Sequence, residues 1–392
     1  MRIPPDLEQN AMLTPGEFQL GTQIVYGPGV LSRLGELATS LGIRRALVVS
    51  DPGIVAAGHA GRGVDLLTAA GIATTLFDGA QENPTDREVD QGVALARQVE
   101  PDLLVGLGGG SSLDCAKGIN FVYTGGGRIH DYWGVGKATK PMLPMIAVPT
   151  TAGTGSELQS YALISDSVTH RKMACGDKKA TCRIALLDPE VTVTQPAQVT
   201  ALTGLDAVSH ALESHVTRTR TEMSQLFSRQ AWRLCANHFL RVLTEPHDLV
   251  ARAAMQWGAA LAGLAIENSM LGAAHALANP LTARYGIAHG QAVGVMLPAV
   301  IEFNASIVED LYLDLANELS SDWGNEPSVP GLVECVRRLI AASGLKSSLR
   351  ELEVVADQLP ELAADAEKQW TAKHNPRPVD SQILLSLYQR AW

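Results

Sequence analysis

The sequence predicts an α/β domain with a parallel sheet followed by an all-α domain, and three observations support this fold class. Up to about residue 190, short apolar runs alternate with longer amphipathic stretches, a pattern typical of parallel strands joined by helical crossovers. Beyond that point, apolar residues recur at helical spacing and strand signals are few. The chain of 392 residues is also longer than a single core usually grows. We therefore expect an α/β domain at residues 1–190 and a helical domain at residues 191–392.

Short apolar runs in the first half mark the strands of the predicted sheet. They span residues 45–50, 73–77, 103–107 and 144–148. A helical stretch follows the first run through about residue 70, and another covers residues 85–99, where Thr85 or Asp86 would cap its first turn. In the second half, helices are expected over residues 200–213, 222–243 and 249–265.

The overall charge argues against a nucleic-acid partner. The net charge is -10 and the isoelectric point is near 5.5, whereas phosphate binding requires a basic surface. The densest basic segment contains Arg171, Lys172, Lys178 and Lys179, and we expect it to be a solvated loop.

Cysteine content and hydropathy favour a cytoplasmic protein. The five cysteines are odd in number, scattered and without a CxxC pair, so neither a disulfide framework nor a zinc ribbon is indicated. No apolar run approaches the ~20 residues that a spanning helix needs, and the N-terminus lacks a secretory pattern. We therefore expect no membrane partner.

Residues 106–117 form a glycine-rich segment where an expected strand ends and an expected helix begins. Gly108, Gly109, Gly110 and Ser111 occupy the turn. Glycines let the backbone approach a pyrophosphate, and the free N–H groups and dipole of a helix N-terminus favour its charge. The spacing differs from the usual G-x-G-x-x-G fingerprint, so a simple tight turn explains this loop equally well.

A second loop at residues 149–157 also follows an expected strand. Its hydroxyls, on Thr150, Thr151, Thr154 and Ser156, suit a phosphate, a ribose or the nicotinamide carboxamide. Two such loops at strand carboxyl ends mark the usual ligand position in an open α/β sheet.

Asp51 ends the first strong strand and has two interpretations. Its carboxylate suits the adenosine ribose and would repel a 2′-phosphate, which favours NAD(H) over NADP(H). Alternatively it caps a helix, because Pro52 and Gly53 follow it.

A carboxylate and three histidines form a candidate metal site. Asp206 and His210 are four residues apart in a helical pattern and so share one helix face. With His275 and His289 they would suit iron(II) or zinc. Each histidine alone is more often structural than a ligand, and spacing does not show that the four converge.

These segments together resemble the iron-containing (group III) alcohol dehydrogenases, a family that includes lactaldehyde reductases and butanol dehydrogenases. The resemblance covers nearly the whole chain, from residue 27 to at least residue 304. The resemblance rests on the motifs GGGSSLDCAK at 108–117, PTTAGTGSE at 149–157, TGLDAVSHALE at 203–213, and HALANP at 275–280 with AHG at 288–290.

The resemblance implies a dinucleotide-binding α/β domain and a helical metal-binding domain, in the dehydroquinate synthase-like fold. It implies hydride transfer between NAD(H) and a small alcohol or aldehyde, and a homodimer or larger homo-oligomer. The family's metal ligands correspond to Asp206, His210, His275 and His289. Its phosphate-binding loops correspond to residues 108–111 and 150–156, and its acidic cofactor discriminator to Asp51.

One position departs from the family pattern. Many members carry a second histidine one helical turn after the third metal ligand, thought to serve the proton path, where this chain has Asn279. An amide does not exchange protons near neutral pH, but it can hydrogen-bond a substrate or water. We therefore expect Asn279 to position substrate or water.

Other functions share this architecture. A glycerol dehydrogenase-like, maleylacetate reductase-like or dehydroquinate synthase-like enzyme is an alternative, although the spacing of the four metal candidates fits the alcohol dehydrogenases better. A catalytically silent nucleotide-binding or scaffold protein is a further alternative, and the complete ligand set argues against it.

Overall fold

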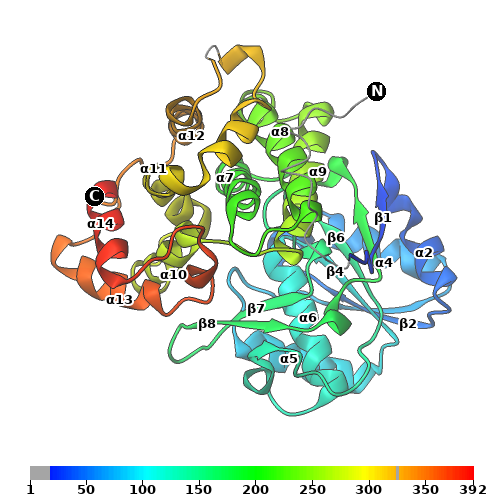
Figure 1. The fold of residues 1–392 in the computed structure, drawn as a ribbon. Helices are drawn as coiled ribbons and strands as arrows, with labels where there is room; N and C mark the ends of the chain where they lie inside the picture. Colours follow the sequence, from blue (N-terminus) through cyan, green and yellow to red (C-terminus); the bar gives the residue numbers. More distant parts are fainter. Residues whose placement is uncertain (1–17, 324–325) are drawn as a thin grey trace, which may run out of the picture.

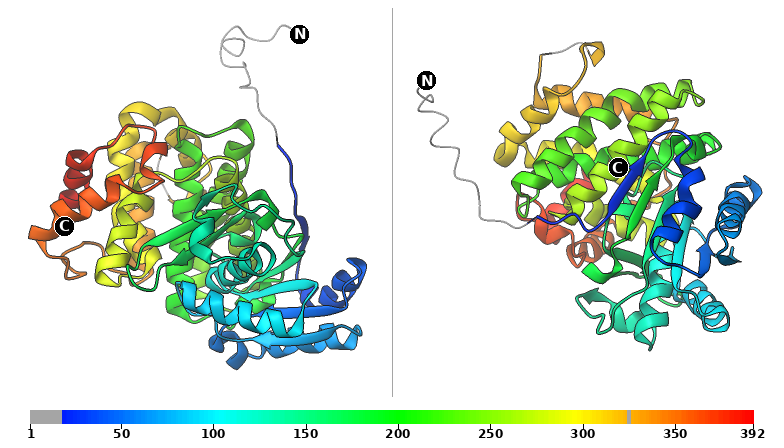
Figure 2. Two further views of the ribbon diagram at one scale, coloured as in Figure 1. Left: turned by 90° about the horizontal axis from the view of Figure 1, so that it is seen from below. Right: turned by 90° about the vertical axis from the view of Figure 1, so that its right-hand side faces the viewer.

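The computed structural model describes residues 18–323 and 326–392 (Figure 1). The expectation of an N-terminus without a secretory pattern rests mainly on residues 1–17, outside the described ranges. The α/β elements and the last helices lie at opposite ends of the molecule (Figure 2), which agrees with the predicted order of an α/β part and a helical part.

The α/β part is built on a six-stranded parallel sheet with the order β1-β9-β6-β4-β2-β3. The strands are β1 (Gln23–Tyr26), β2 (Arg45–Val49), β3 (Ala73–Phe77), β4 (Leu103–Gly108), β6 (Met145–Pro149) and β9 (Ile184–Leu187). The chain runs from β2 outward to β3 but returns to β4 on the other side of β2. The strand order therefore reverses between β2 and β4, where ligands usually bind in such sheets.

Helices cover both faces of this sheet, as a parallel sheet requires. Apolar side chains of α2 (Leu34–Ser40) and α4 (His59–Ala69) pack on one face. Those of α5 (Asp86–Val99) and α6 (Gly110–Gly125) pack on the other. The central strand β4 is buried along its whole length, so its carboxyl end holds the following loop firmly.

A small second sheet, β5-β8-β7, was not expected from the sequence. It contains β5 (Gly134–Val135), β7 (Tyr161–Ser165) and β8 (Lys172–Gly176). The expectation of a solvated loop is wrong for Lys172, because this residue begins β8 opposite Ser165. Arg171, Lys178 and Lys179 are exposed, in agreement with that expectation.

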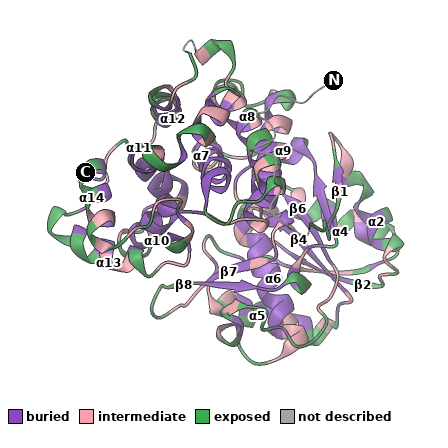
Figure 3. Ribbon diagram, viewed as in Figure 1, coloured by how far each residue is buried: buried purple, intermediate pink, exposed green. Residues whose placement is uncertain are grey.

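The helical part packs around α7. Its helices are α7 (Ala197–Val216), α8 (Glu222–Thr244), α9 (Leu249–Glu267), α10 (Ala273–Tyr285), α11 (His289–Ala316), α12 (Val329–Ala342), α13 (Leu359–Glu367) and α14 (Ser381–Ala391). Most residues of α7 and α11 are buried (Figure 3). Among the described residues, α9 and α11 are apolar enough to span a membrane, but 78% and 72% of their most apolar windows are buried. They are therefore core helices.

Candidate active site

The two glycine-bearing loops lie side by side at the carboxyl ends of β4 and β6. The N–H of Thr150 donates to the carbonyl of Gly108 at 2.9 Å, and the two strands pair up to Gly108 and Pro149. The first loop leads directly into α6, whose N-terminus has no side-chain cap among the described residues. The N–H groups of the first turn of α6 are thus available to an anion.

The hydroxyls of the second loop have different surroundings. Thr150 Oγ1 is buried and has no hydrogen-bond partner within the described part of the chain, which is unusual for a buried hydroxyl. Thr154 Oγ1 accepts the N–H of Ser156 at 3.3 Å. Ser156 is buried, and its hydroxyl donates to Asp114 Oδ1 at 2.7 Å. The contacts of Ser156 thus hold the loop in place.

Lys117, on α6, binds the same loop through Ser156. This role was not predicted from the sequence. The Lys117 ammonium group is fully buried, and its three N–H groups face four acceptors, which are Ser156 Oγ and the carbonyls of Ser156, Gln159 and Tyr161. Distances from Nζ to these four atoms are 2.6–3.0 Å. A buried ammonium is costly unless every N–H is paired, so this arrangement fixes the loop against α6. Lys117 belongs to the first quoted motif, which was the available signal.

The position of Asp51 confirms the helix-capping interpretation. Its Oδ1 accepts the N–H of Ile54 at 3.1 Å and so caps the short helix α3 (Pro52–Ala56). Its Oδ2 accepts the hydroxyl of Ser112, in the first turn of α6, at 2.9 Å. The carboxylate therefore stands beside the glycine turn at the point where the strand order reverses.

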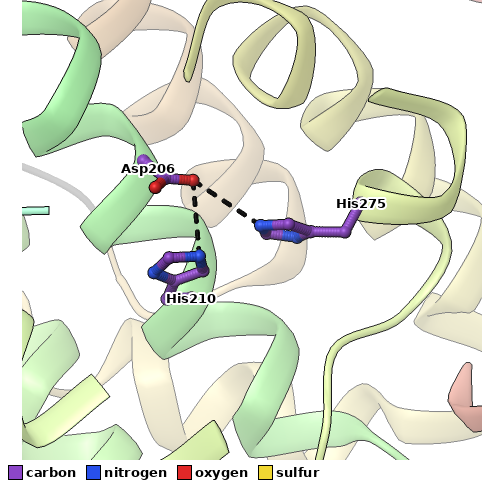
Figure 4. Close-up of side chains that lie close together, drawn as sticks. All are labelled: Asp206, His210 and His275. Atoms are coloured by element: carbon purple, nitrogen blue, oxygen red, sulfur yellow. Dashed lines mark ion pairs between the residues drawn. The ribbon is translucent and has the colours of Figure 1, made fainter. Parts of the chain in front are cut away.

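Three of the four candidate metal ligands, from the two helices α7 and α10, meet in the structure. Asp206 and His210 project from α7, and His275 lies in the first turn of α10 (Figure 4). Asp206 Oδ1 lies 3.4 Å from His210 Nε2 and 3.6 Å from His275 Nε2. One ligand atom from each of these three residues lies within 4.8 Å of the others. The convergence that spacing left open is therefore present for these three residues.

These distances match the requirements of a divalent cation. Ligand atoms at about 2.1 Å from a tetrahedral zinc ion lie about 3.4 Å from one another. Asp206 Oδ1 and His275 Nε2 are buried and lack a hydrogen-bond partner among the described residues. Buried polar atoms are normally satisfied, so the two atoms point to a ligand at this position.

His289 stands at the edge of the group. It begins α11, and its Nε2 lies 3.8 Å from Asp206 Oδ1. It is not part of the tighter three-residue cluster, and its side chain keeps 24% exposure. This position makes it the most accessible of the four expected ligands.

The protonation properties of the group follow from burial and from its own charges. Burial would raise the pKa of Asp206, but the imidazoles around it hold that pKa well below its usual range. Burial lowers the pKa of His210. Burial also lowers the pKa of His289, and the nearby positive charge of Lys172 adds to this. An ionised carboxylate and neutral imidazoles are the forms that bind a metal.

His275 behaves differently because it contacts two carboxylates. Burial lowers its pKa, but Asp206 and Glu213 together outweigh burial and raise the pKa of His275 to about 9. Glu213, which the sequence reasoning did not single out, lies behind the ring, 2.6 Å from Nδ1.

The metal candidates directly adjoin the second glycine loop. His210 Nδ1 lies 3.3 Å from the carbonyl oxygen of Gly153, a residue of that loop. The loop backbone also touches α9, where Gly155 and Gly263 approach so closely that neither has room for a Cβ atom. The α/β loops and the metal group thus form one continuous site.

Asn279 lies one turn after His275 on α10, as expected. It is half-buried, and its amide Nδ2 donates to Gln369 Oε1 at 3.0 Å. Gln369 comes from the segment after α13 and was not foreseen from the sequence. Asn279 and Gln369 thus place two amide groups, neither of which titrates, one helical turn after His275.

Comparison with known proteins extends the similarity over both halves of the chain. The model of the iron-containing alcohol dehydrogenase family matches residues 21–189, and the model of the C-terminal part of this family matches residues 200–392. The chain is 33% identical to the NAD-dependent methanol dehydrogenase of Bacillus methanolicus, over 94% of this chain and 97% of that protein.

Two further proteins show the same extent of similarity. The lactaldehyde reductase of Escherichia coli is 30% identical, over 94% of this chain and 97% of that protein. The crystal structure of a 1,3-propanediol oxidoreductase superimposes with a TM-score of 0.90 at 31% identity, covering 94% of this chain and 98% of that chain.

Proposed function

Because the chain belongs to the iron-containing alcohol dehydrogenase family, we propose that it interconverts a small alcohol and its aldehyde with NAD(H) as the hydride carrier. The convergence of Asp206, His210 and His275 next to the second glycine loop carries this proposal. It supports an oxidoreductase over a silent nucleotide-binding protein, because such a protein has no use for this ligand set.

We propose that Asp206, His210, His275 and His289 hold a divalent cation, with iron(II) preferred and zinc as the alternative. When bound, such a cation supplies Lewis acidity toward the oxygen of an alcohol or carbonyl substrate. Asp206 provides negative charge, and the imidazoles set the geometry. The unpartnered Asp206 Oδ1 and His275 Nε2 support this assignment.

The cofactor would lie across the two loops, with hydride exchange at its nicotinamide ring. The turn at residues 108–111 and the N-terminus of α6 would bind the pyrophosphate, because N–H groups there favour negative charge. The hydroxyls of Thr150, Thr151 and Thr154 would bind the nicotinamide half, and the unpartnered Thr150 Oγ1 supports this. Asp51, beside the same turn, favours NAD(H) through repulsion of a 2′-phosphate.

Asn279 would position the substrate or a water molecule. Its Nδ2 is oriented by Gln369, and its amide oxygen is an acceptor for a hydroxyl group. Because neither amide titrates, the proton of the alcohol would leave through water or the hydroxyls of the cofactor.

We also propose a cytoplasmic homodimer or larger homo-oligomer. All five cysteines are free and buried, which suits a reducing compartment. Strand β1 forms an edge of the sheet, and Tyr26 on it is 68% exposed beside Trp257. Light scattering of the purified protein measures the assembly, and a monomer would contradict the proposal.

The experiment that tests the function is anaerobic purification with elemental analysis, followed by activity assays. Methanol, 1,3-propanediol and lactaldehyde are the first substrates, with NAD(H) and NADP(H) compared. We expect one bound iron or zinc per chain and turnover with at least one small alcohol or aldehyde. Protein reconstituted with iron(II) and with zinc that turns over none of them would contradict the proposal.

Two variants complete the test. His275→Ala should remove both tight metal binding and turnover while the fold is kept. His238→Ala is the control, because His238 lies on α8 and contacts the carbonyl of Leu234 instead of the site. Full activity of a metal-free His275→Ala protein would refute the assignment.

A further inference from the structure

We infer that Glu213 is a positioning residue that aligns His275 for metal binding, both through its imidazole ring and through its backbone. This inference rests on the metal site proposed above and adds a residue behind it. Glu213 is not among the candidate ligands, since its carboxylate faces the Nδ1 side of His275 while Asp206 faces the Nε2 side.

The position of Glu213 on α7 places it next to the ligands of the same helix. Residues on an α-helix advance by about 100° each, so positions 206, 210 and 213 fall within about 60° of one another. Glu213 is 2% exposed, and a carboxylate so deeply buried requires strong partners. The structure provides them on the neighbouring helix α10.

The carboxylate of Glu213 binds the first turn of α10 in two ways. Oε1 accepts the N–H of Ala274 at 2.7 Å. Oε2 accepts Nδ1–H of His275 at 2.6 Å and lies 3.4 Å from the backbone N of the same residue. Helix α10 begins after Gly272 without a side-chain cap from its own N-cap residue. Glu213 thus caps α10 from another helix and holds the ring of His275 with the same group.

This geometry determines which nitrogen of His275 is free for a metal. An ionised carboxylate only accepts hydrogen bonds, so the proton of the neutral ring must lie on Nδ1. The lone pair then lies on Nε2, the atom 3.6 Å from Asp206 Oδ1. Carboxylates that accept the second N–H of a metal-bound histidine fix its tautomer and raise its basicity.

The test uses Glu213→Gln with cobalt(II) as the probe. The amide side chain keeps the size but has no charge and only one accepting oxygen, so it cannot accept both Ala274 N–H and Nδ1–H of His275. Loss of such a partner typically weakens metal affinity about 10–100-fold. We expect that loss in a chelator competition assay, together with a shift of the cobalt d–d absorption bands, measured on full-length metal-free protein titrated with cobalt(II) alone.

Asp188→Asn is the matched control. Asp188 is also a buried carboxylate that accepts backbone N–H groups, from Gly29, Leu31 and Glu190 at 2.9–3.0 Å. It makes no hydrogen bond to a histidine in the described part of the chain. We expect this variant to have a lower melting temperature but wild-type cobalt affinity and spectrum.

The outcomes separate this inference from the function on which it rests. Glu213→Gln with a lower melting temperature but unchanged cobalt affinity and spectrum would overturn the positioning role. If wild-type protein does not bind cobalt(II), the proposed metal site itself fails. Should Glu213→Gln not fold, Glu213→Asp is the second variant. It keeps the negative charge, but its side chain is one methylene shorter, so the carboxylate lies farther from His275. Wild-type affinity in Glu213→Asp would then overturn the inference.

Discussion

Glu157 makes the stability of the protein depend on pH in a direction opposite to that of most carboxylates. It is the last residue of the second glycine loop, lies in the short 3-10 helix η3 (Ser156–Leu158), and is 3% exposed. Burial raises the pKa of Glu157 to about 7, and the charge of Lys117 opposes this only in part. The folded protein therefore binds a proton that the unfolded chain has already lost above about pH 4.5.

The sign and size of the effect follow from this difference. Because the folded pKa is the higher one, the full stability is present below about pH 4.5 and is lost as the pH rises toward 7. A difference of about 2.5 pKa units corresponds to about 3 kcal/mol of free energy of unfolding. Glu157→Gln keeps the shape and cannot ionise. We expect it to match the wild type near pH 4.5 and to exceed it by up to about 3 kcal/mol at pH 8.

Urea unfolding between pH 4.5 and 8.5 measures this difference. Both proteins are studied with EDTA and without nucleotide, because ligand binding would add its own stabilisation. Glu334→Gln, on the exposed side of α12, is the control for removing a carboxylate from the surface. If the curves of wild type and Glu157→Gln stay parallel over the whole range, the reasoning about Glu157 is wrong.

Three further predictions concern the cofactor loops and the proton path. Asp51→Asn keeps a good helix cap but removes the charge, so steady-state assays should show a higher NADPH-to-NADH ratio of kcat/KM; an unchanged ratio contradicts the discriminator role. Asn279→His introduces a group that titrates near neutral pH, and we expect a changed pH profile of kcat with little change in the KM for NADH; the same profile in both proteins would count against a proton-path position. Gly263→Ala places a Cβ atom 2.3 Å from the carbonyl oxygen of Gly155. We expect this variant to lower the free energy of unfolding by about 1–3 kcal/mol and to raise the KM for NADH. Gly61→Ala, which has open space around the new Cβ atom, should change neither quantity. Equal melting temperatures of the two alanine variants would contradict the close loop–helix contact.

The central strands could be predicted because they are buried on both faces. The expected runs at residues 45–50, 103–107 and 144–148 coincide with β2, β4 and β6 to within one residue. Thr85, one of the two expected caps, begins α5. The edge strand β1 and its neighbour β9 have only four residues each, too few for periodicity to distinguish them from loops. The small sheet was missed for two reasons. Strand β5 has only two residues, and a lysine such as Lys172 is expected on the surface unless its pairing with β7 is known.

The site was predictable only as far as its residues are neighbours in sequence. Asp206 and His210 share a helix, so their proximity follows from helical geometry. Glu213 was on the same face and within a quoted motif, but its role depends on His275, 62 residues away. Likewise, Gln369 lies 90 residues from Asn279. No periodicity connects such pairs, because tertiary packing alone brings them together.

The packing around α7 explains how ligands so distant in sequence are held in one geometry. Asp206 and His210 belong to this helix, and the third ligand, His275, is fixed to it through Glu213. The fourth, His289, precedes Gly290, where a Cβ atom would meet the carbonyl oxygen of Leu202 at 2.1 Å. Only glycine allows α11 to approach the α7 backbone so closely, so the start of α11 is also positioned by α7. A small shift of α7 would therefore displace all four groups together, which is why substitutions at Glu213 and Gly290 should combine non-additively in their effect on metal affinity.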